Sequence, residues 1–227
     1  MFAKETIEDI IQWDVANWGQ SIFYWDEILS NKKEMLCLET GARKGGLSLL
    51  AALYGHHAVC SDIENPAAYA APLHKKYNVE KLVSYEAIDL LNIPYENYFD
   101  IVFIKSVLPT IGANNNKQLQ QKALDEIYKC LKPGGYLLFA ENLEASALHR
   151  FARKNFVAWG GAAGYLKLKE INSMFSKFPV VKYKTTGFLA LFGRTQKQRN
   201  LIGKIDSIFD KIIPASWKYL VIGKAKK

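Results

Sequence analysis

The sequence predicts one α/β domain built around a mostly parallel β-sheet. Between residues 34 and 140, short apolar runs alternate with helical stretches. Alternation of this kind implies strand–helix–strand crossovers, which require parallel strands with helices on both faces. The chain has 227 residues, of which 49% are hydrophobic, so it is long enough for one domain with a sizeable core.

An N-terminal helical cap, residues 1–33, is predicted to precede the main domain at residues 34–227. Residues 5–30 carry apolar side chains at helical spacing, interrupted around Gly19. Three tryptophans fall within this stretch, and packing of their rings onto the main body is the simplest explanation for them. A lid over a ligand is the alternative, because polar side chains such as Gln20 lie among the rings.

Five strands are predicted in the first part of the main domain, each from an apolar run. They comprise residues 35–39, 57–62, 82–89, 99–108 and 136–140. Helices are predicted between them at residues 46–53, 66–76 and 118–131. Lys132-Pro-Gly-Gly135 ends the last of these helices, because proline cannot continue a helix and glycine tolerates the turn. Parallel sheets bind ligands beyond the carboxyl ends of their strands, so the residues that end these strands are the first candidates for a site.

Beyond residue 140 the pattern predicts three helices, at residues 145–156, 166–175 and 195–213. Residues 180–192 are predicted to form a strand or a hairpin broken at Gly187, and residues 217–224 a final strand. The helix at 195–213 is amphipathic, with one apolar side formed by Leu201, Ile205, Ile208 and Ile212. Packing of that side on the sheet is the expected role, and contact with an anionic membrane is the alternative.

Charge is divided unevenly along the chain. Residues 1–113 contain 9 basic and 15 acidic side chains, whereas residues 114–227 contain 21 basic and 7 acidic ones. No segment has the roughly 18 uncharged apolar residues of a membrane span, and residues 1–8 lack the features of a signal peptide. We therefore expect a cytoplasmic protein without a transmembrane segment.

The cysteines and histidines show no pattern of a metal site. Cys37, Cys60 and Cys130 form no CxxC motif and lie in apolar or helical stretches, so we expect buried, reduced thiols. The four histidines have no ligand spacing to each other or to the cysteines. No metal is predicted.

A glycine-rich loop after the first strand carries the strongest functional signal. Glu39-Thr40-Gly41-Ala-Arg43-Lys44-Gly45-Gly46 opens a helix, and glycines there allow a ligand to approach the backbone. A P-loop would need a lysine after the last glycine, where Leu47 stands. A dinucleotide fingerprint would need glycine where Arg43 stands. The remaining pattern is an acidic residue followed by spaced glycines.

Together with four segments further along the chain, this loop resembles the motifs of class I S-adenosylmethionine-dependent methyltransferases. The first motif is matched by Glu39, Gly41 and Gly45, with Arg43 replacing the middle glycine. Asp62 ends the second strand, where the family holds the ribose hydroxyls, and Asp89 falls where it contacts the adenine. Residues 99–106 resemble the fourth strand, and residues 131–139 the turn into the fifth strand.

The resemblance covers residues 34–142 in register and implies both a fold and a cofactor. The fold is a Rossmann-like, doubly wound, mostly parallel seven-stranded sheet whose last strand is antiparallel, and the cofactor is S-adenosylmethionine. The residues that it implies for cofactor binding are Glu39, Thr40, Gly41, Arg43, Gly45, Asp62, Ile63, Asp89, Leu90 and Lys105.

Several of these residues have structural alternatives. Asp62 accepts hydrogen bonds well from vicinal hydroxyls, but it could also cap the helix that begins near Asn65. Glu39 either orients the loop or binds the cofactor's ammonium group. Asp89 is equally explained as a turn residue, and Lys105 either meets the ligand or extends to solvent.

Methyl transfer to a hydroxyl also needs a base, for which Glu141 and His149 are candidates. The alternative for His149 is a surface position on a helix. An acceptor-site insert is expected at about residues 141–178, where five basic residues gather: Arg150, Arg153, Lys154, Lys167 and Lys169. They favour a small anionic metabolite, such as a sugar or nucleotide-linked compound, as acceptor and partner, with a solvated surface as the alternative.

RNA is the less favoured macromolecular partner, with Phe151, Phe156 and Trp159 available for stacking on bases. The segment after the fourth strand, Lys105-Ser-Val-Leu-Pro109, lacks the Asn/Asp-Pro-Pro-aromatic sequence of nucleic-acid amine methylases, which argues against that class. A non-catalytic nucleotide-binding protein on the same fold is the remaining alternative, motivated by Arg43.

Overall fold

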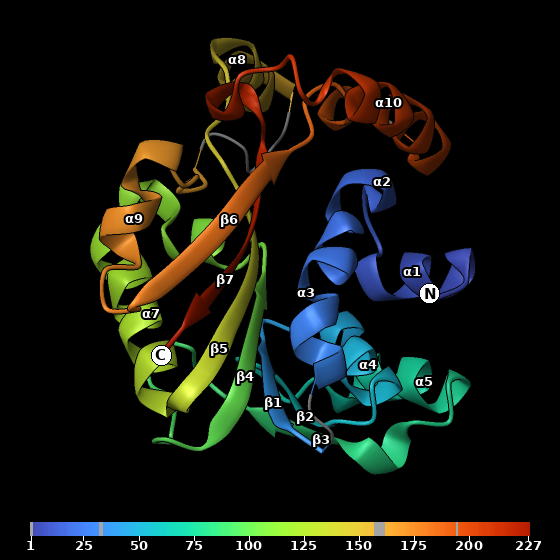
Figure 1. Ribbon diagram of the computed structural model, residues 1–227, viewed down its shortest axis with the longest axis vertical. Helices are drawn as coiled ribbons and strands as arrows, with labels where there is room; N and C mark the ends of the chain where they lie inside the picture. The colour runs from blue at the N-terminus through green and yellow to red at the C-terminus, as the bar shows by residue number, and fades with distance from the viewer. Residues whose placement is uncertain (1, 32–33, 157–161, 194) are drawn as a thin grey trace.

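The computed structural model describes residues 2–31, 34–156, 162–193 and 195–227. Its centre is a seven-stranded sheet with the order β3-β2-β1-β4-β5-β7-β6 (Figure 1). The strands are β1 Leu36–Thr40, β2 His57–Asp62, β3 Val83–Ala87, β4 Phe99–Lys105, β5 Leu131–Asn142, β6 Val180–Thr186 and β7 Leu220–Lys226. β7 is antiparallel to both β5 and β6, and the other neighbouring strands are parallel. The predicted Rossmann-like fold class is confirmed.

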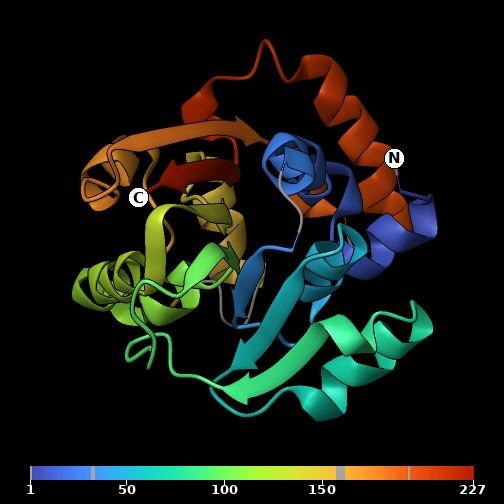
Figure 2. The same ribbon diagram turned by 60° about the horizontal axis from the view of Figure 1, so that its bottom comes forward.

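Helices cover both faces of the sheet (Figures 1 and 2). One face is covered by α1 Lys4–Ile11, α2 Val15–Trp18, α3 Gln20–Asn31, α4 Gly46–Leu53 and α5 Ala67–Lys76. The other is covered by α6 Leu108–Ile111, α7 Lys117–Cys130 and α9 Ile171–Met174. α8 Ala147–Phe156 and α10 Gln196–Phe209 lie at the end of the sheet where β5 and β6 finish. Short 3-10 helices span Glu80–Leu82, Ala113–Asn115, Leu168–Glu170, Ala190–Phe192 and Ala215–Trp217.

The N-terminal helices pack closely on the main body. Trp25 is fully buried, its indole N–H donates to the carbonyl of Gly223 over 3.0 Å, and its ring lies against Phe103. The carbonyl of Ile10 approaches α4 so closely that a Cβ on Gly46 would lie 2.0 Å from it. For Trp25, packing onto the main body is therefore the correct interpretation.

Several element boundaries differ from the predicted ones for local reasons. The N-terminal helix has a second break, before α2, because Gln12 and Asp14 adopt φ angles of 69° and 44°. β4 ends at Lys105 rather than at residue 108, because Ser106 has a φ of 59° and the chain then turns into α6. Residues 180–192 contain one strand and a 3-10 helix instead of a hairpin, since β6 pairs with β7.

The expected packing of the helix at residues 195–213 is wrong. α10 contacts α2 and the 3-10 helix Ala190–Phe192 rather than the sheet. Its apolar side faces solvent, with Leu201 64% exposed and Ile208 72% exposed. Across the described residues, no helix is long and apolar enough to cross a membrane.

The cysteine prediction is confirmed. Cys37, Cys60 and Cys130 are buried and carry free thiols. Burial raises the pKa of all three thiols, that of Cys130 to about 12, because a thiolate is poorly solvated inside an apolar core.

Candidate functional site

The parallel register brings the strand ends together at one edge of the sheet. Thr40 lies opposite Ile104, and Lys105 lies opposite Ala140, one residue before Glu141. β2 lies on the other side of β1 and ends at Asp62. Most of the predicted site residues therefore gather along one edge, which faces upward in Figure 1. Such an edge is where open α/β sheets bind their ligands.

The loop after β1 follows the backbone path that glycines allow. Gly41 and Gly45 have φ angles of +63° and +71°, and an added Cβ would lie 2.8 Å from Val107 and 2.7 Å from the His74 ring, respectively. Arg43 has a φ of 51°, in the left-handed region that glycine adopts freely. The loop thus keeps the conformation expected of the missing glycine, at a strain of roughly 1–2 kcal/mol for a residue with a side chain.

Glu39 holds the start of α4 in place. One carboxylate oxygen accepts from the backbone N–H of Leu47 over 3.0 Å, and the other accepts from the N–H and hydroxyl of Ser48, both over 2.7 Å. Desolvation raises the pKa of this buried carboxyl, while the hydrogen bonds from Ser48 and Leu47 act in the opposite direction. The structure supports an orienting role for Glu39, since its carboxylate faces the positive end of the α4 dipole.

Asp62 connects β2 to the same loop. Its two carboxylate oxygens accept from the backbone N–H of Arg43 over 3.0 Å and of Ile63 over 2.8 Å. The capping alternative for Asp62 is wrong, because the side chain of Asn65 accepts from Ala67 at the start of α5. Asp62 is half-buried and keeps further acceptor positions, and the adjacent Ile63 is 74% exposed. A carboxylate beside an exposed apolar side chain suits a sugar that carries a flat base.

Asp89 forms the turn that follows β3. Its side chain accepts from the backbone N–H of Leu91 over 2.9 Å, and its carbonyl accepts from Asn92 over 2.9 Å. The turn interpretation is confirmed, and the carboxylate remains exposed. Leu90 points into the apolar core, with only 7% of its surface exposed.

Lys105 and Glu141 occupy the centre of the edge. The Lys105 ammonium donates to the carbonyl of Ile11 over 3.1 Å and lies 5.8 Å from the centre of the Trp18 ring. Burial lowers the pKa of Lys105, against the attraction of Glu39. The Trp18 ring is 3% exposed and belongs to the same core cluster as Trp25, so it also packs onto the main body.

Glu141 is fully buried and only partly satisfied. One oxygen accepts from the backbone N–H groups of Val107 and Leu108, over 3.0 and 3.3 Å. The other oxygen has no hydrogen-bond partner among the residues that the structure describes. Desolvation dominates the environment of this carboxyl and raises its pKa to about 8, although both hydrogen bonds and Lys105 oppose the shift.

His149 is buried, so the predicted surface position is wrong. Its Nε2 hydrogen-bonds with the carbonyl of Phe188 over 2.7 Å, and its Nδ1 hydrogen-bonds with the Ser146 hydroxyl over 2.7 Å. Burial lowers its pKa, which favours the neutral ring. His149 connects α8 to the segment after β6.

The five basic residues of the insert do not form one free surface. Arg153 is buried and donates to the carbonyls of Leu143 and Glu144, over 2.6 and 3.3 Å, while its guanidinium stacks on Tyr165 at 3.9 Å. Arg150 pairs with Glu144 at 4.0 Å. Among the aromatic residues considered for RNA, Trp159 lies outside the described residues.

A buried polar cluster near this edge was not predicted from the sequence. Asn17 donates to Asp14, Asp206 and Tyr219, and the Tyr219 hydroxyl also donates to Asp14. Desolvation raises the pKa of Asp14 to about 7, although the hydrogen bond from Tyr219 lowers it. Because up to 205 residues separate these partners, no local motif signals the cluster.

The residues at the edge fit S-adenosylmethionine. Buried polar groups are normally hydrogen-bonded, so the Thr40 hydroxyl, one Glu141 oxygen and the Trp18 indole N–H, which have no partner among the described residues, are candidates for hydrogen bonds to a ligand. The left-handed loop offers close backbone approach, and Asp62 with Ile63 offers the ribose and base contacts described above. A sulfonium is compatible with the carboxylates of Glu39 and Glu141 at this edge.

Comparison with known proteins identifies the domain. Residues 38–139 match the family model of the methyltransferase domain, and this stretch contains the loop, Asp62, Asp89 and β4. Residues 38–139 of the chain form a methyltransferase domain. S-adenosylmethionine is the cofactor that this match to the methyltransferase domain implies. No curated protein sequence matches the chain.

Solved structures share the fold of this methyltransferase domain and its flanking elements. The MccD protein aligns with a TM-score of 0.64 and 17% identity, over 93% of this chain and 98% of its own. N-methyltransferase NodS from Bradyrhizobium japonicum, solved with S-adenosyl-L-homocysteine, aligns with a TM-score of 0.61 and 14% identity, over 99% and 97%. Phosphoethanolamine N-methyltransferase 2 from Haemonchus contortus was solved with S-adenosyl-L-methionine. It aligns with a TM-score of 0.64 and 17% identity, over 98% of this chain and 56% of its own. At these identities the likeness concerns the fold.

Proposed function

We propose that the protein transfers the methyl group of S-adenosylmethionine to a small metabolite that carries an anionic group, such as a sugar or nucleotide-linked compound. The observation that carries this proposal is the loop from Glu39 to Gly45, held by Glu39 on one side and by Asp62 on the other. This geometry keeps backbone and carboxylate groups in place before a ligand arrives, which is the main contribution that a methyltransferase makes to its reaction.

The cofactor contacts are assigned along the strand ends. Asp62 would accept hydrogen bonds from the ribose hydroxyls, and Ile63 and Asp89 would contact the base. Thr40, Gly41, Gly45 and the backbone of Arg43 would hold the methionine part. When bound, S-adenosylmethionine supplies an activated methyl group on a sulfonium, so no covalent catalysis is required of the protein.

Glu141 is the base that we assign for a hydroxyl acceptor. Its second oxygen has no partner in the described part of the chain, and a pKa of about 8 suits proton transfer near neutral pH. The carboxylate form increases as the pH rises through about 8, so activity is expected to rise over that range. His149 is not assigned to proton transfer here, because both of its ring nitrogens are engaged within the protein.

The anionic character of the acceptor is supported by Lys105. Its ammonium has three donors, one of which meets the carbonyl of Ile11, and it stands between the ends of β1 and β5. It can therefore meet a carboxylate of the cofactor or of the acceptor.

We further assign residues 1–33 as a cap and residues 141–178 as the acceptor-site insert. We place the reaction in the cytoplasm on the basis of the three free thiols.

The test is methyl transfer from labelled S-adenosylmethionine into a metabolite extract separated by anion exchange. Label is expected in the retained, anionic small-molecule fraction. Glu141→Gln is expected to reduce its appearance by about 10²–10⁴-fold, the usual contribution of a general base, whereas the exposed Glu27→Gln leaves it unchanged. Label only in the unretained fraction would contradict the anionic acceptor, and label only in RNA would favour the macromolecular alternative.

A further inference from the structure

Helix α10 presents its apolar side to solvent. Leu201, Ile205 and Ile208 are 64%, 39% and 72% exposed, although their spacing of four and three residues places them on one stripe. A surface helix of a globular protein normally buries such a stripe against the core. The orientation of α10 is therefore inverted relative to that of an ordinary amphipathic helix.

The side of α10 that faces the protein fixes this orientation. Asp206 is 2% exposed and accepts from the backbone N–H groups of Phe188, Leu189 and Ala190, over distances of 3.0, 2.7 and 3.0 Å. Gly203 contacts α2 so closely that a Cβ would lie 2.4 Å from that of Ala16. Rotation of α10 to bury its isoleucines would leave three backbone donors and a carboxylate without partners, so the apolar side remains outward.

The exposed apolar surface continues beyond the end of α10. Phe209, the last residue of α10, is 47% exposed, and Ile212 beyond it is 76% exposed. Trp217, in the 3-10 helix Ala215–Trp217, is 50% exposed and stacks on Phe188 with ring centres 6.1 Å apart. Large apolar side chains that remain exposed along one segment indicate an interaction surface.

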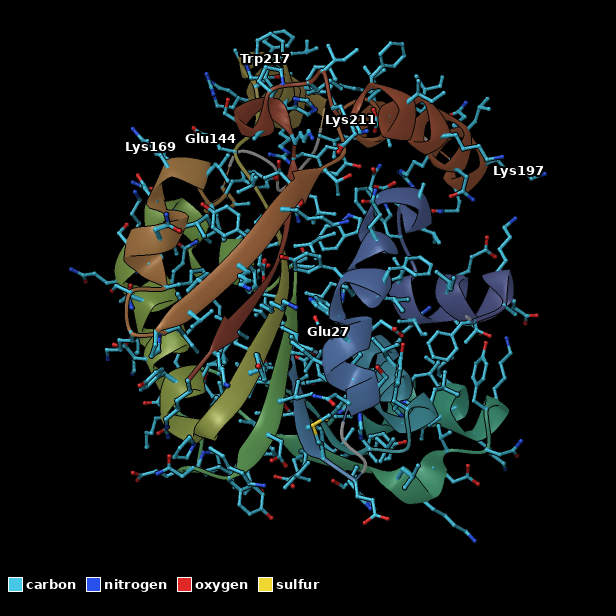
Figure 3. All side chains as sticks on the ribbon, viewed as in Figure 1. Glu27, Glu144, Lys169, Lys197, Lys211 and Trp217 are labelled. Atoms are coloured by element: carbon cyan, nitrogen blue, oxygen red, sulfur yellow. The ribbon has the colours of Figure 1, made fainter. Side chains whose placement is uncertain are left out.

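Lysines border this surface on one side. Lys197 and Lys204 are exposed and seven residues apart on α10, a spacing that keeps them along one line, and the exposed Lys211 follows the end of the helix. On a helical projection this line lies next to the stripe of Leu201 and Ile208 and away from the inward Asp206. Figure 3 shows Lys197, Lys211 and Trp217 at the same end of the molecule. An apolar stripe with a flanking basic row is the pattern of a helix that lies in a lipid interface.

We propose that α10 and the segment up to Trp217, called here the α10 face, dock on the surface of an anionic phospholipid bilayer. The isoleucines and Leu201 enter the boundary between headgroups and acyl chains, and the three lysines meet lipid phosphates. Trp217 has the amphipathic ring that favours this depth. Docking of this face would place the end of the sheet that holds the methyltransferase site toward the membrane (Figure 1).

Flotation of the full chain with vesicles tests this docking. We expect binding to vesicles of phosphatidylcholine with about one third phosphatidylglycerol, weaker binding at high salt, and little binding to phosphatidylcholine alone. Ile208→Ser with Ile212→Ser is expected to weaken binding at least tenfold. The matched control is Tyr69→Ser, which removes a 69% exposed ring from α5 on another part of the surface. Lys197→Gln with Lys211→Gln should abolish the preference for anionic lipid.

The substituted side chains are exposed, so each variant is expected to melt with the wild type by circular dichroism and to bind S-adenosylhomocysteine as the wild type does. These measurements separate docking from the methyltransferase activity. Absence of vesicle binding by the wild type, or equal binding by the Ile208→Ser, Ile212→Ser variant, would overturn the proposal. A dimer in light scattering that this variant abolishes, without vesicle binding, would instead assign the face to a second copy of the chain.

Discussion

Replacement of Glu39 by glutamine tests how the loop at the methyltransferase site is held. Glu39 is 3% exposed, and its two oxygens accept three hydrogen bonds, from Leu47 and Ser48 at the start of α4. A glutamine keeps one acceptor oxygen and turns an NH₂ group toward donors, so one or two of these bonds are lost. Each hydrogen bond to a charged group contributes about 1.5–3 kcal/mol, and the helix dipole adds about 0.3–1 kcal/mol.

Burial of the Glu39 carboxylate costs desolvation free energy, which is why its pKa is raised. The neutral glutamine avoids this cost, and that offsets part of the free energy lost with the hydrogen bonds. We therefore expect Glu39→Gln to reduce the free energy of unfolding by about 2–4 kcal/mol. For a domain of this size the melting temperature should fall by about 5–15 °C. Urea denaturation followed by circular dichroism measures the change.

The control for this prediction is Glu27→Gln. Glu27 pairs with Lys224 at 3.1 Å, but its side chain is 84% exposed, so its loss should change the free energy of unfolding by less than about 1 kcal/mol. If Glu39→Gln were as stable as Glu27→Gln, the carboxylate would not hold α4, and the account of the loop would be wrong.

Three further predictions follow from the loop, the strand end and α10. Arg43→Gly should be more stable than Arg43→Ala by about 1 kcal/mol, since only glycine relieves the left-handed strain; equal urea midpoints would contradict this. Glu141 has a pKa raised from 4.5 to about 8, so its folded form retains a proton that the unfolded form loses. The free energy of unfolding should therefore fall between pH 5 and about 8 more steeply in the wild type than in Glu141→Gln, and parallel pH profiles would refute the shift. Asp206→Asn should lower the free energy of unfolding by about 2–3 kcal/mol, because one oxygen cannot satisfy three backbone donors; an unchanged thermal melt would contradict the fixed orientation of α10.

The sequence was sufficient to predict features that depend on neighbours along the chain. Strand ends at Thr40, Asp62 and Lys105 meet at one edge because parallel strands with crossover helices leave no other arrangement. The loop was recognised from its glycines and Glu39, although the hydrogen bonds of Glu39 to α4 depend on the local turn. Whether Asp62 caps the following helix could be decided only from the structure, because Asn65 suits the cap equally well.

Features that depend on distant residues could not be predicted in this way. Periodicity divides α10 into two sides but does not show which side is buried, and Asp206 decides this through donors at residues 188–190. The burial of His149 depends on Phe188 and Tyr219. The contact of Asn17 with Tyr219 spans 202 residues, so neither sequence spacing nor residue type indicated it.

Calorimetry with S-adenosylhomocysteine tests the central claim, that the edge formed by the ends of β1 and β2 binds the methyl donor. The wild type is expected to bind, and Asp62→Asn should weaken binding by about 10- to 100-fold, the equivalent of one charge-assisted hydrogen bond. Asp125 lies on α7 and forms a surface ion pair with Lys177. Asp125→Asn should therefore bind S-adenosylhomocysteine as the wild type does. No binding by the wild type, or equal affinities of the Asp62→Asn and Asp125→Asn variants, would contradict the account.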